Sequence, residues 1–109
     1  MNIYLTELDA ICGLHQTGYI YDFHLSGNDL LWVQEKLHVR VGEFAIRECH
    51  QFCSRTQKSR RTIVFGIVAL YYNIKGILIK HYSYNAPTTP LIIIKKLDEM
   101  IIYSQSNTY

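Results

Sequence analysis

The longest apolar run of the chain reads Ile63-Val64-Phe65-Gly66-Ile67-Val68-Ala69-Leu70-Tyr71-Tyr72. A strand with one face in water alternates apolar and polar residues, whereas this run is apolar at its odd and its even positions. Its ten residues are too few to cross a bilayer as a helix, which takes about 20 residues. The run therefore predicts a central strand of a sheet, covered on both faces.

A hairpin is expected directly after this run. Residues 73–76, Asn-Ile-Lys-Gly, have the composition of a tight turn. They lead into an apolar segment at residues 77–84, which predicts the partner strand. Connections of this length leave no room for crossover helices, so the sheet is expected to be mostly antiparallel.

Three further strands are expected upstream. They cover residues 21–25, residues 30–33 with a continuation to Val41 after a break at residues 34–36, and residues 44–52. In the last of these we predict that the even-numbered positions face the core, because they include two phenylalanines and an isoleucine. Across the sheet, the residues expected to be largely buried are Phe23, Leu25, Phe44, Ile46, Ile67 and Ile79.

Both ends of the chain have helical patterns. Over residues 4–16, apolar residues recur at three- and four-residue spacing, and Gly18 is a natural C-terminal cap. Thr89 and Pro90 suit the N-cap and the first position of a second helix, expected to end by residue 103. The apolar stripe of this second helix consists of Leu91, Ile94, Leu97 and Ile101.

These elements predict an α+β fold. The sheet is mostly antiparallel, has four to five strands, and is flanked by an N-terminal and a C-terminal helix. A chain of 109 residues is the size of one domain. We assign residues 1–103 to that domain and expect residues 104–109 to be a frayed tail.

Charge is divided unevenly along the chain, although the net charge is only +2. Residues 1–48 hold seven acidic and three basic residues, whereas residues 49–97 hold no acidic residue. Such a division means either that the two parts neutralise each other in the fold or that one face meets an anionic partner. The basic residues of the second part are Arg55, Lys58, Arg60, Arg61, Lys75, Lys80, Lys95 and Lys96.

Residues 54–62 form a polar, basic loop without periodicity. Cations on a loop can clamp phosphates, so this segment is a candidate site for nucleic acid or another polyanion. The loop contains no aromatic residue that would stack on a base. A solvated loop whose charges offset the acidic residues of the first strands is the favoured interpretation. The candidate polyanion-binding residues are Arg55, Lys58, Arg60 and Arg61.

The cluster Cys49-His50-Gln51-Phe52-Cys53 suggests a metal site, with His38 or His81 as further ligands. In a straight strand the sulfurs of Cys49 and Cys53 lie about 13 Å apart, whereas tetrahedral zinc needs them within about 4 Å. A metal site therefore requires a turn inside this segment. Half-buried structural thiols are the favoured interpretation, and no metal ligand is assigned.

Two acid–imidazole pairs are candidates for general acid–base chemistry. Glu48 and His50 share one face of a predicted strand, as do Asp22 and His24. A carboxylate two residues from a histidine can orient the imidazole as a general base. The sequence has no nucleophile elbow, phosphate-binding loop or zinc-protease motif. We therefore assign no catalytic residue and no cofactor.

Composition bears on partners and location. The nine tyrosines suit half-buried sheet faces and interfaces, which favours self-association. Three cysteines, an odd number, argue against a disulfide framework and for a reducing, cytoplasmic setting. The first residues have neither a basic leader nor an apolar segment of a secretory signal, and no membrane partner is expected.

Several short segments have the residue types and spacing of one protein family. They are Gly18-Tyr19, Asp22-Phe23-His24-Leu25, Glu43-Phe44-Ala45-Ile46, Phe52 and Lys75-Gly76-Ile77-Leu78-Ile79. From Gly18 to about Leu97 the chain resembles a family of small, uncharacterised bacterial proteins of about this length. Members carry an acidic loop where this chain has residues 55–61, so the resemblance implies no shared function of that loop.

Members of this family are sometimes labelled phosphoribosylpyrophosphate synthetase. Enzymes of that name are several times longer, and they need an acidic phosphoribosyl-binding loop and a nucleotide site. Nothing in this sequence matches either feature, so the label is not carried over. The resemblance implies no activity and no site residues.

We expect a small, non-enzymatic interaction domain that acts through protein–protein contacts. A homodimer is expected, because symmetric dimers are the commonest oligomers, and a further protein partner is expected beside it. Two alternatives stay open. One is weak nucleic-acid or polyanion binding through residues 55–61, and the other is an enzyme that uses Glu48 and His50.

Overall fold

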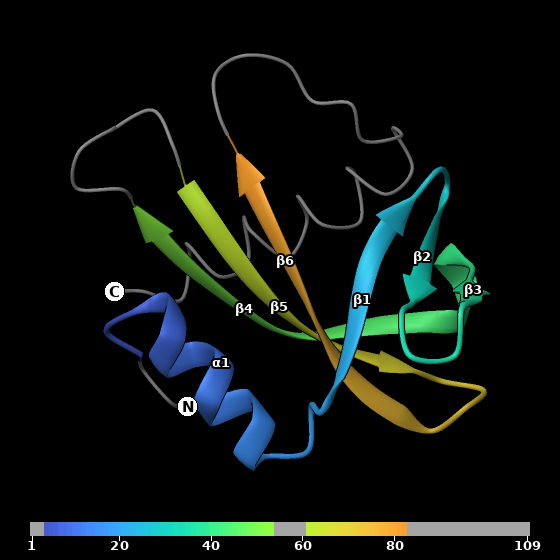
Figure 1. Ribbon diagram of the computed structural model, residues 1–109, viewed down its shortest axis with the longest axis horizontal. Helices are drawn as coiled ribbons and strands as arrows, with labels where there is room; N and C mark the ends of the chain where they lie inside the picture. Colours follow the sequence, from blue (N-terminus) through green and yellow to red (C-terminus); the bar gives the residue numbers. More distant parts are fainter. Residues whose placement is uncertain (1–3, 54–60, 83–109) are drawn as a thin grey trace.

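The computed structural model describes residues 4–53 and 61–82, which form one α-helix, one 3₁₀ helix and six strands (Figure 1). This part of the chain is α+β, as predicted. The predicted C-terminal helix and the tail at residues 104–109 lie outside the described residues. The elements are α1 (Glu7–Gln16), β1 (Tyr21–Ser26), β2 (Asp29–Trp32), β3 (Leu37–Val39), η1 (Val41–Glu43), β4 (Phe44–Cys53), β5 (Arg61–Ala69) and β6 (Ile74–Tyr82).

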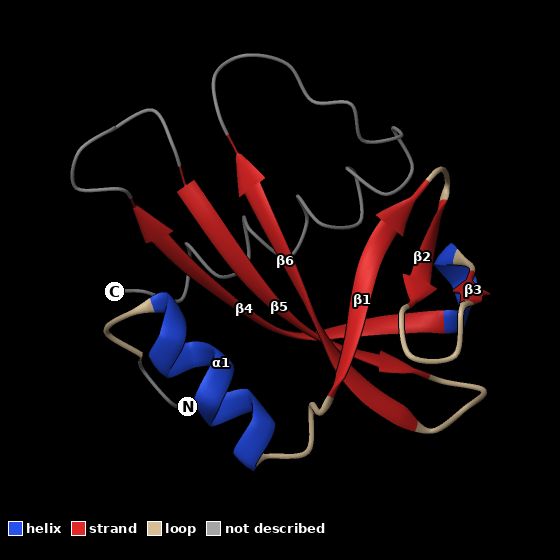
Figure 2. Cartoon of the chain, in the orientation of Figure 1, coloured by secondary structure: helices blue, strands red, loops and turns tan. Residues whose placement is uncertain are grey.

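The six strands form one mixed sheet in the order β3-β2-β1-β6-β5-β4 (Figure 2). Four of the five strand pairs are antiparallel, but β1 and β6 run parallel, with Tyr21 opposite Gly76. The prediction of a mostly antiparallel sheet of four to five strands is therefore only partly correct. A parallel pair usually needs a crossover helix. Here four intervening strands bring the chain back to β1, which is why short connections did not exclude it.

The sheet must curl, because its two edge strands are nearly consecutive in the chain. In a flat sheet β3 and β4 would lie five strand spacings apart, about 24 Å. Only Arg40 to Glu43 connect them, and the five steps from Val39 to Phe44 reach at most about 18 Å. Figure 1 shows β4 starting near β3 and then crossing the molecule. The sheet therefore has a concave inner face and an outer face.

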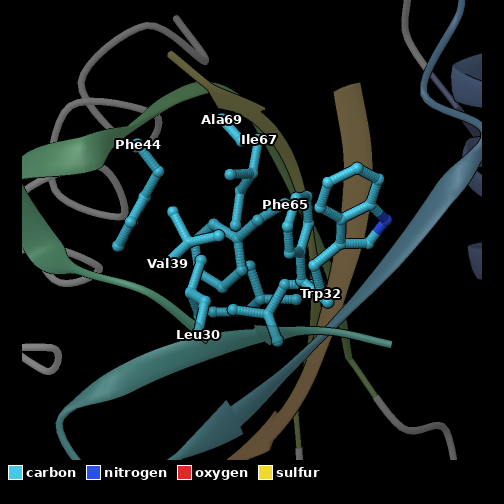
Figure 3. Packing of buried hydrophobic residues seen from close by; sticks show 10 residues of the cluster. Leu30, Trp32, Val39, Phe44, Phe65, Ile67 and Ala69 are labelled. Carbon is cyan, nitrogen blue, oxygen red and sulfur yellow. The ribbon is translucent and has the colours of Figure 1, made fainter. Parts of the chain in front are cut away.

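The inner face holds the main core (Figure 3). Odd-numbered positions of β5 point into it, and β1, β2, β3 and β4 close around them. Burial of each large apolar side chain contributes roughly 1.5 to 3 kcal/mol. The buried residues of this cluster are Phe23, Leu30, Trp32, Val39, Phe44, Ile63, Phe65, Ile67, Ala69 and Leu78.

The outer face is covered by α1 over part of its area. A second cluster joins Leu14 of α1 to Tyr19, to Val64 of β5 and to Ile77 of β6. Strand β5 is thus apolar on both faces because both faces are covered, which confirms the prediction for residues 63–69. The last three residues of the apolar run, 70–72, instead belong to the turn before β6.

Two predictions of burial on the sheet are wrong. Ile79 is 39% exposed, because it lies opposite Val64 and so faces outward beside the area that α1 covers. The even positions of β4 do not all face the inner core. A β-bulge at Arg47 shifts the register between Ile46 and Glu48, so the side chains after it change faces. Phe23, Phe44 and Ile67 are buried as predicted, whereas Leu25 and Ile46 are half-buried against the core.

Helix α1 starts later than the apolar stripe predicted. Thr6 is its N-cap, and its hydroxyl accepts a hydrogen bond from the Asp9 amide at 3.1 Å. Gly18 follows the helix with φ of 100°, which confirms it as a C-terminal signal. Leu5 and Leu8 are 88% and 67% exposed, so the buried side is turned away from them. The buried residues of α1 are Ala10 and Leu14.

Candidate functional site

The bulge at Arg47 brings Glu48 and His50 to the outer face, beside the start of α1. Their side chains are joined by a hydrogen bond between His50 Nε2 and Glu48 Oε1 at 3.0 Å. The His50 side chain is 14% exposed and that of Glu48 is 32% exposed. Without the bulge the alternation of β4 would turn both polar side chains into the inner core. The pairing of these two residues, predicted from their spacing, is therefore confirmed.

Tyr19 is the third member of this group, and sequence reasoning did not single it out as a site residue. It is only 4% exposed, and the charge and hydrogen bonding of Glu48 raise its pKa beyond the effect of burial. Gly66 leaves room for this contact, since a Cβ there would lie 3.0 Å from the Tyr19 ring and 3.2 Å from Glu48 Cβ. The only sequence signal is a glycine in the middle of an otherwise apolar strand, which marks a close approach.

Tyr19 and His50 are each covered by a further side chain. Lys75 Nζ lies 4.4 Å from the centre of the Tyr19 ring and donates a hydrogen bond to the Thr17 carbonyl at 2.9 Å. Tyr4 packs edge-on against His50, with ring centres 4.8 Å apart. The group formed by Tyr4, Tyr19, Glu48, His50 and Lys75 is called the outer polar network below. It links α1 and both its flanking segments to β4 and β6.

Gly13 explains how the Tyr4 ring lies so close to α1. A Cβ at Gly13 would fall on the Tyr4 ring, so no other residue fits there without moving the ring. From the sequence, a glycine at this position is expected to weaken the helix by roughly 1 kcal/mol. The helix nevertheless runs through Gly13 to Gln16, and the glycine serves the contact with Tyr4.

The chemistry open to the outer polar network is acid–base chemistry. If the neutral imidazole donates its Nε2 hydrogen to Glu48, then Nδ1 carries the lone pair of a general base. Most of the His50 surface is covered, and Glu48 is shared with Tyr19. What these contacts accomplish in the fold is to hold α1 and the segment after it on the sheet.

The outer polar network predicts a loss of stability in alkali. Burial raises the pKa of Tyr19 above its ordinary value of 10.0, and the charge and hydrogen bond of Glu48 raise it further. Above pH 10 the unfolded chain therefore releases the Tyr19 proton while the folded protein still holds it. Stability from this group is complete below that pH and is lost as the pH rises through the folded pKa.

Urea unfolding at a series of pH values on both sides of 10 measures this loss. Tyr19→Phe has no proton to release, so its stability is expected to fall less steeply with pH than that of the natural protein. Tyr71→Phe is the control, because Tyr71 is 77% exposed in the single chain; at a protein concentration where the chain is monomeric, it should leave the slope unchanged. Equal slopes for Tyr19→Phe and the natural protein would show that another group causes the alkaline loss.

The candidate polyanion site lies mostly outside the described residues. Arg55, Lys58 and Arg60 fall there. Arg61, predicted to be part of the loop, is instead the first residue of β5, where it is exposed and pairs with Cys53 of β4. Its Nη1 donates a long hydrogen bond of 3.4 Å to Gln51 Oε1. Of the four candidate residues, only Arg61 is described, and its guanidinium is bound by Gln51 on the adjacent strand.

No hydrogen bond or ion pair joins the side chains of Asp22 and His24, the second acid–imidazole pair among the described residues. Asp22 Oδ2 accepts a hydrogen bond from Gln34 Nε2 at 2.8 Å, and the Asp22 amide donates to Gln34 Oε1 at 3.0 Å. This exchange ties the β2–β3 turn to β1. His24 and Asp22 are both exposed on the outer side of β1.

The cysteine cluster does not have the turn that a metal site requires. Cys49 and Cys53 belong to the continuous strand β4, opposite Phe65 and Arg61 of β5. His81 contacts the Thr62 hydroxyl at 2.9 Å, and His38 lies 3.9 Å from an Asp29 oxygen. Within residues 4–53 and 61–82, no three His, Cys, Asp or Glu side chains are grouped so that they could hold a metal ion.

A group of exposed apolar side chains lies at the end of the β5–β6 hairpin. Leu70, Tyr71 and Tyr72 are 48%, 77% and 44% exposed, and Leu37 of β3 is 41% exposed. Leu37 lies opposite Trp32 in the sheet, and the Trp32 ring lies 5.4 Å from that of Tyr72. These four residues are called the hairpin-end surface below.

Sequence reasoning missed the hairpin-end surface because it extended the central strand to Tyr72. The strand ends at Ala69, and Asn73 takes a left-handed conformation with φ of 52°. Asparagine is the residue after glycine that most readily adopts this conformation. The sequence signal was therefore Asn73 itself, which favours a turn that ends at this residue rather than one that begins there.

An aromatic chain lies beneath the hairpin-end surface. Tyr21 of β1 packs edge-on against Trp32 of β2 with ring centres 5.3 Å apart, and Trp32 in turn contacts Tyr72. The Leu70 amide donates a hydrogen bond of 2.8 Å to the Glu43 carbonyl. The hairpin end is thus fixed both through its backbone and through its rings.

Comparison with known proteins adds no relative. No protein-family model, no curated protein and no solved structure matches the chain. In the part of the chain that the structure describes, the helices are too short or too polar to cross a membrane. The side chains and their geometry therefore carry what is inferred about function.

Proposed function

We propose that the protein is a small, non-enzymatic interaction domain that associates with itself through the hairpin-end surface. The observation that carries this proposal is the gathering of four exposed, large apolar side chains from two distant segments. Single exposed apolar residues are ordinary, whereas a contiguous group marks an interaction site. Tyrosine is also among the residues enriched at interfaces.

The hairpin-end surface is supported in a way that favours binding. Tyr72 rests on Trp32, which is itself 7% exposed, and the Leu70 backbone is tied to Glu43. A surface that is already ordered loses less conformational entropy when a partner binds. The same apolar groups would otherwise remain in contact with water, at roughly 25 cal/mol for each Å² of apolar area.

The two alternative functions have weaker support. The outer polar network has the hydrogen-bond geometry of an oriented imidazole, but its contacts are those of a clamp between α1 and the sheet. Polyanion binding rests on four cations, of which Arg61 alone is described, and it contacts Gln51. Self-association, in contrast, rests on exposed side chains that all belong to the described residues.

Self-association is expected to depend on the hairpin-end surface. In sedimentation velocity at micromolar concentration, the natural protein should sediment as a dimer of the 12.8 kDa chain. Replacing both Leu70 and Tyr71 with serine should give a monomer, since loss of an aromatic anchor at an interface often costs 2 kcal/mol or more, about thirtyfold.

The matched control for this experiment is Leu8→Ser. Leu8 is 67% exposed but lies on α1, far from the hairpin end (Figure 1), so this variant should remain a dimer. A natural protein that stays monomeric throughout the micromolar range would remove the proposal. So would a dimer that the serine variant retains in full.

A further inference from the structure

Trp32 carries an unpaired polar group beside the hairpin-end surface. Its ring is buried, and its Nε1 has no hydrogen-bond partner among the described residues. Figure 3 shows the nitrogen on the side of the ring turned away from Leu30, Val39 and Ile67. A buried donor without an acceptor is costly, and most buried polar groups in proteins have a partner. Trp32 Nε1 is therefore open to an acceptor that the described residues do not supply.

Tyr71 carries a hydroxyl oxygen that can serve as the hydrogen-bond acceptor for Trp32 Nε1. It is the most exposed side chain of the hairpin-end surface, at 77%, and it lies one residue before the Tyr72 that covers Trp32. A tyrosine combines an apolar ring, which packs on aromatic neighbours, with a hydroxyl oxygen that accepts a hydrogen bond. Within one chain Tyr72 already occupies the position against Trp32, so Tyr71 is left pointing outward.

We propose that Tyr71 of one copy packs on the aromatic chain of Tyr21, Trp32 and Tyr72 in a second copy, where its hydroxyl accepts a hydrogen bond from Trp32 Nε1. This inference rests on the proposed self-association and specifies its contact. The projecting ring and the rings that receive it lie on the same surface. A two-fold axis therefore forms the contact twice, as a symmetric dimer requires.

Tyr72 is the side chain that moves when this contact forms. Trp32 Nε1 is buried in the single chain, while Tyr72 is 44% exposed and meets the Trp32 ring at a tilt of 59°. The proposed contact requires the Tyr72 ring to change its rotamer so that the nitrogen becomes accessible, and such side-chain changes are common at interfaces. The hydrogen bond from Leu70 to Glu43 holds the hairpin in place meanwhile.

Trp32 is the only tryptophan in the chain, so its fluorescence reports directly on the proposed contact. On dilution, the emission of the natural protein should change over the same concentration range in which sedimentation shows the dimer dissociating. Tyr71→Phe keeps the ring but removes the acceptor. Because the symmetric dimer contains the contact twice, the dimer of this variant should be roughly 5- to 100-fold weaker, the fold-change that corresponds to loss of two hydrogen bonds.

Tyr72→Phe is the matched control, because it removes a neighbouring hydroxyl and keeps the ring on Trp32. It should dimerise as the natural protein does. A dimer whose strength is unchanged in Tyr71→Phe, and whose Trp32 emission does not respond to dilution, would overturn the proposed contact while leaving self-association intact. A natural protein that never dimerises would instead overturn self-association itself.

Discussion

Replacement of Phe44 by alanine is expected to lower the free energy of unfolding by about 3 to 5 kcal/mol. Phe44 is 2% exposed and closes the inner core at the point where the chain passes from η1 into β4. Its ring packs in the cluster that includes Val39 and Ile67. Small domains have about 5 to 15 kcal/mol of stability in total, so the variant should be largely unfolded in mild denaturant. Urea unfolding followed by far-ultraviolet circular dichroism measures the change.

The control for Phe44→Ala is Leu5→Ala. Leu5 is also a large apolar residue, but it is 88% exposed just before α1, so its loss should change stability by less than about 0.5 kcal/mol. Equal unfolding midpoints for both variants would contradict the placement of Phe44 on the inner face of the curled sheet.

Gly76→Ala is expected to be almost as damaging, at about 3 kcal/mol. Gly76 lies on the inner face of β6, between Ile67 of β5 and Tyr21 of β1. A Cβ at this position would lie 2.5 Å from Cε2 of Phe23 and 2.7 Å from the Tyr21 carbonyl oxygen. The second of these atoms is backbone in the paired strand, so the clash is relieved only by opening the parallel pair.

Gly42→Ala separates this clash from the general effect of a glycine substitution. At Gly42 a Cβ would meet nothing within 4 Å, and its φ is not in the left-handed region. The alanine there should be neutral or stabilise by up to about 1 kcal/mol, through the lower entropy of the unfolded chain. If thermal unfolding gave the same midpoint for both alanine variants, the close approach of Phe23 to Gly76 would be refuted.

Local patterns predicted the elements that depend on neighbours in the chain. The two-sided apolar run became β5, the alternation of residues 21–25 became β1, and Gly18 marks the end of α1. Each of these depends on a period or a cap that lies within a few residues. The turn after β5 was misplaced because Leu70, Tyr71 and Tyr72 are as apolar as the strand, and water exposure rather than composition distinguishes them.

Features that depend on distant residues could not be predicted in the same way. The bulge at Arg47 has no mark in the local sequence, because it is defined by the two residues of β4 that oppose one position of β5. It decides which face Glu48 and His50 occupy. Glu48 and His50 both follow the bulge, so they share a face whichever face it is, and their pairing could be predicted. Tyr19 was missed because it lies in the segment after α1, far from β4 in the sequence.

The parallel pairing of β1 with β6 has a consequence for how the protein folds. Phe23 and Leu78 lie opposite each other although most of the described chain separates them. Contacts between such distant residues slow folding, because a long loop must close before they form. During synthesis, β1 emerges from the ribosome long before β6, and its open edge can then pair only with β2. Closure of the sheet by the last described strand is thus the late step, and until it occurs the nascent chain exposes a strand edge prone to aggregation.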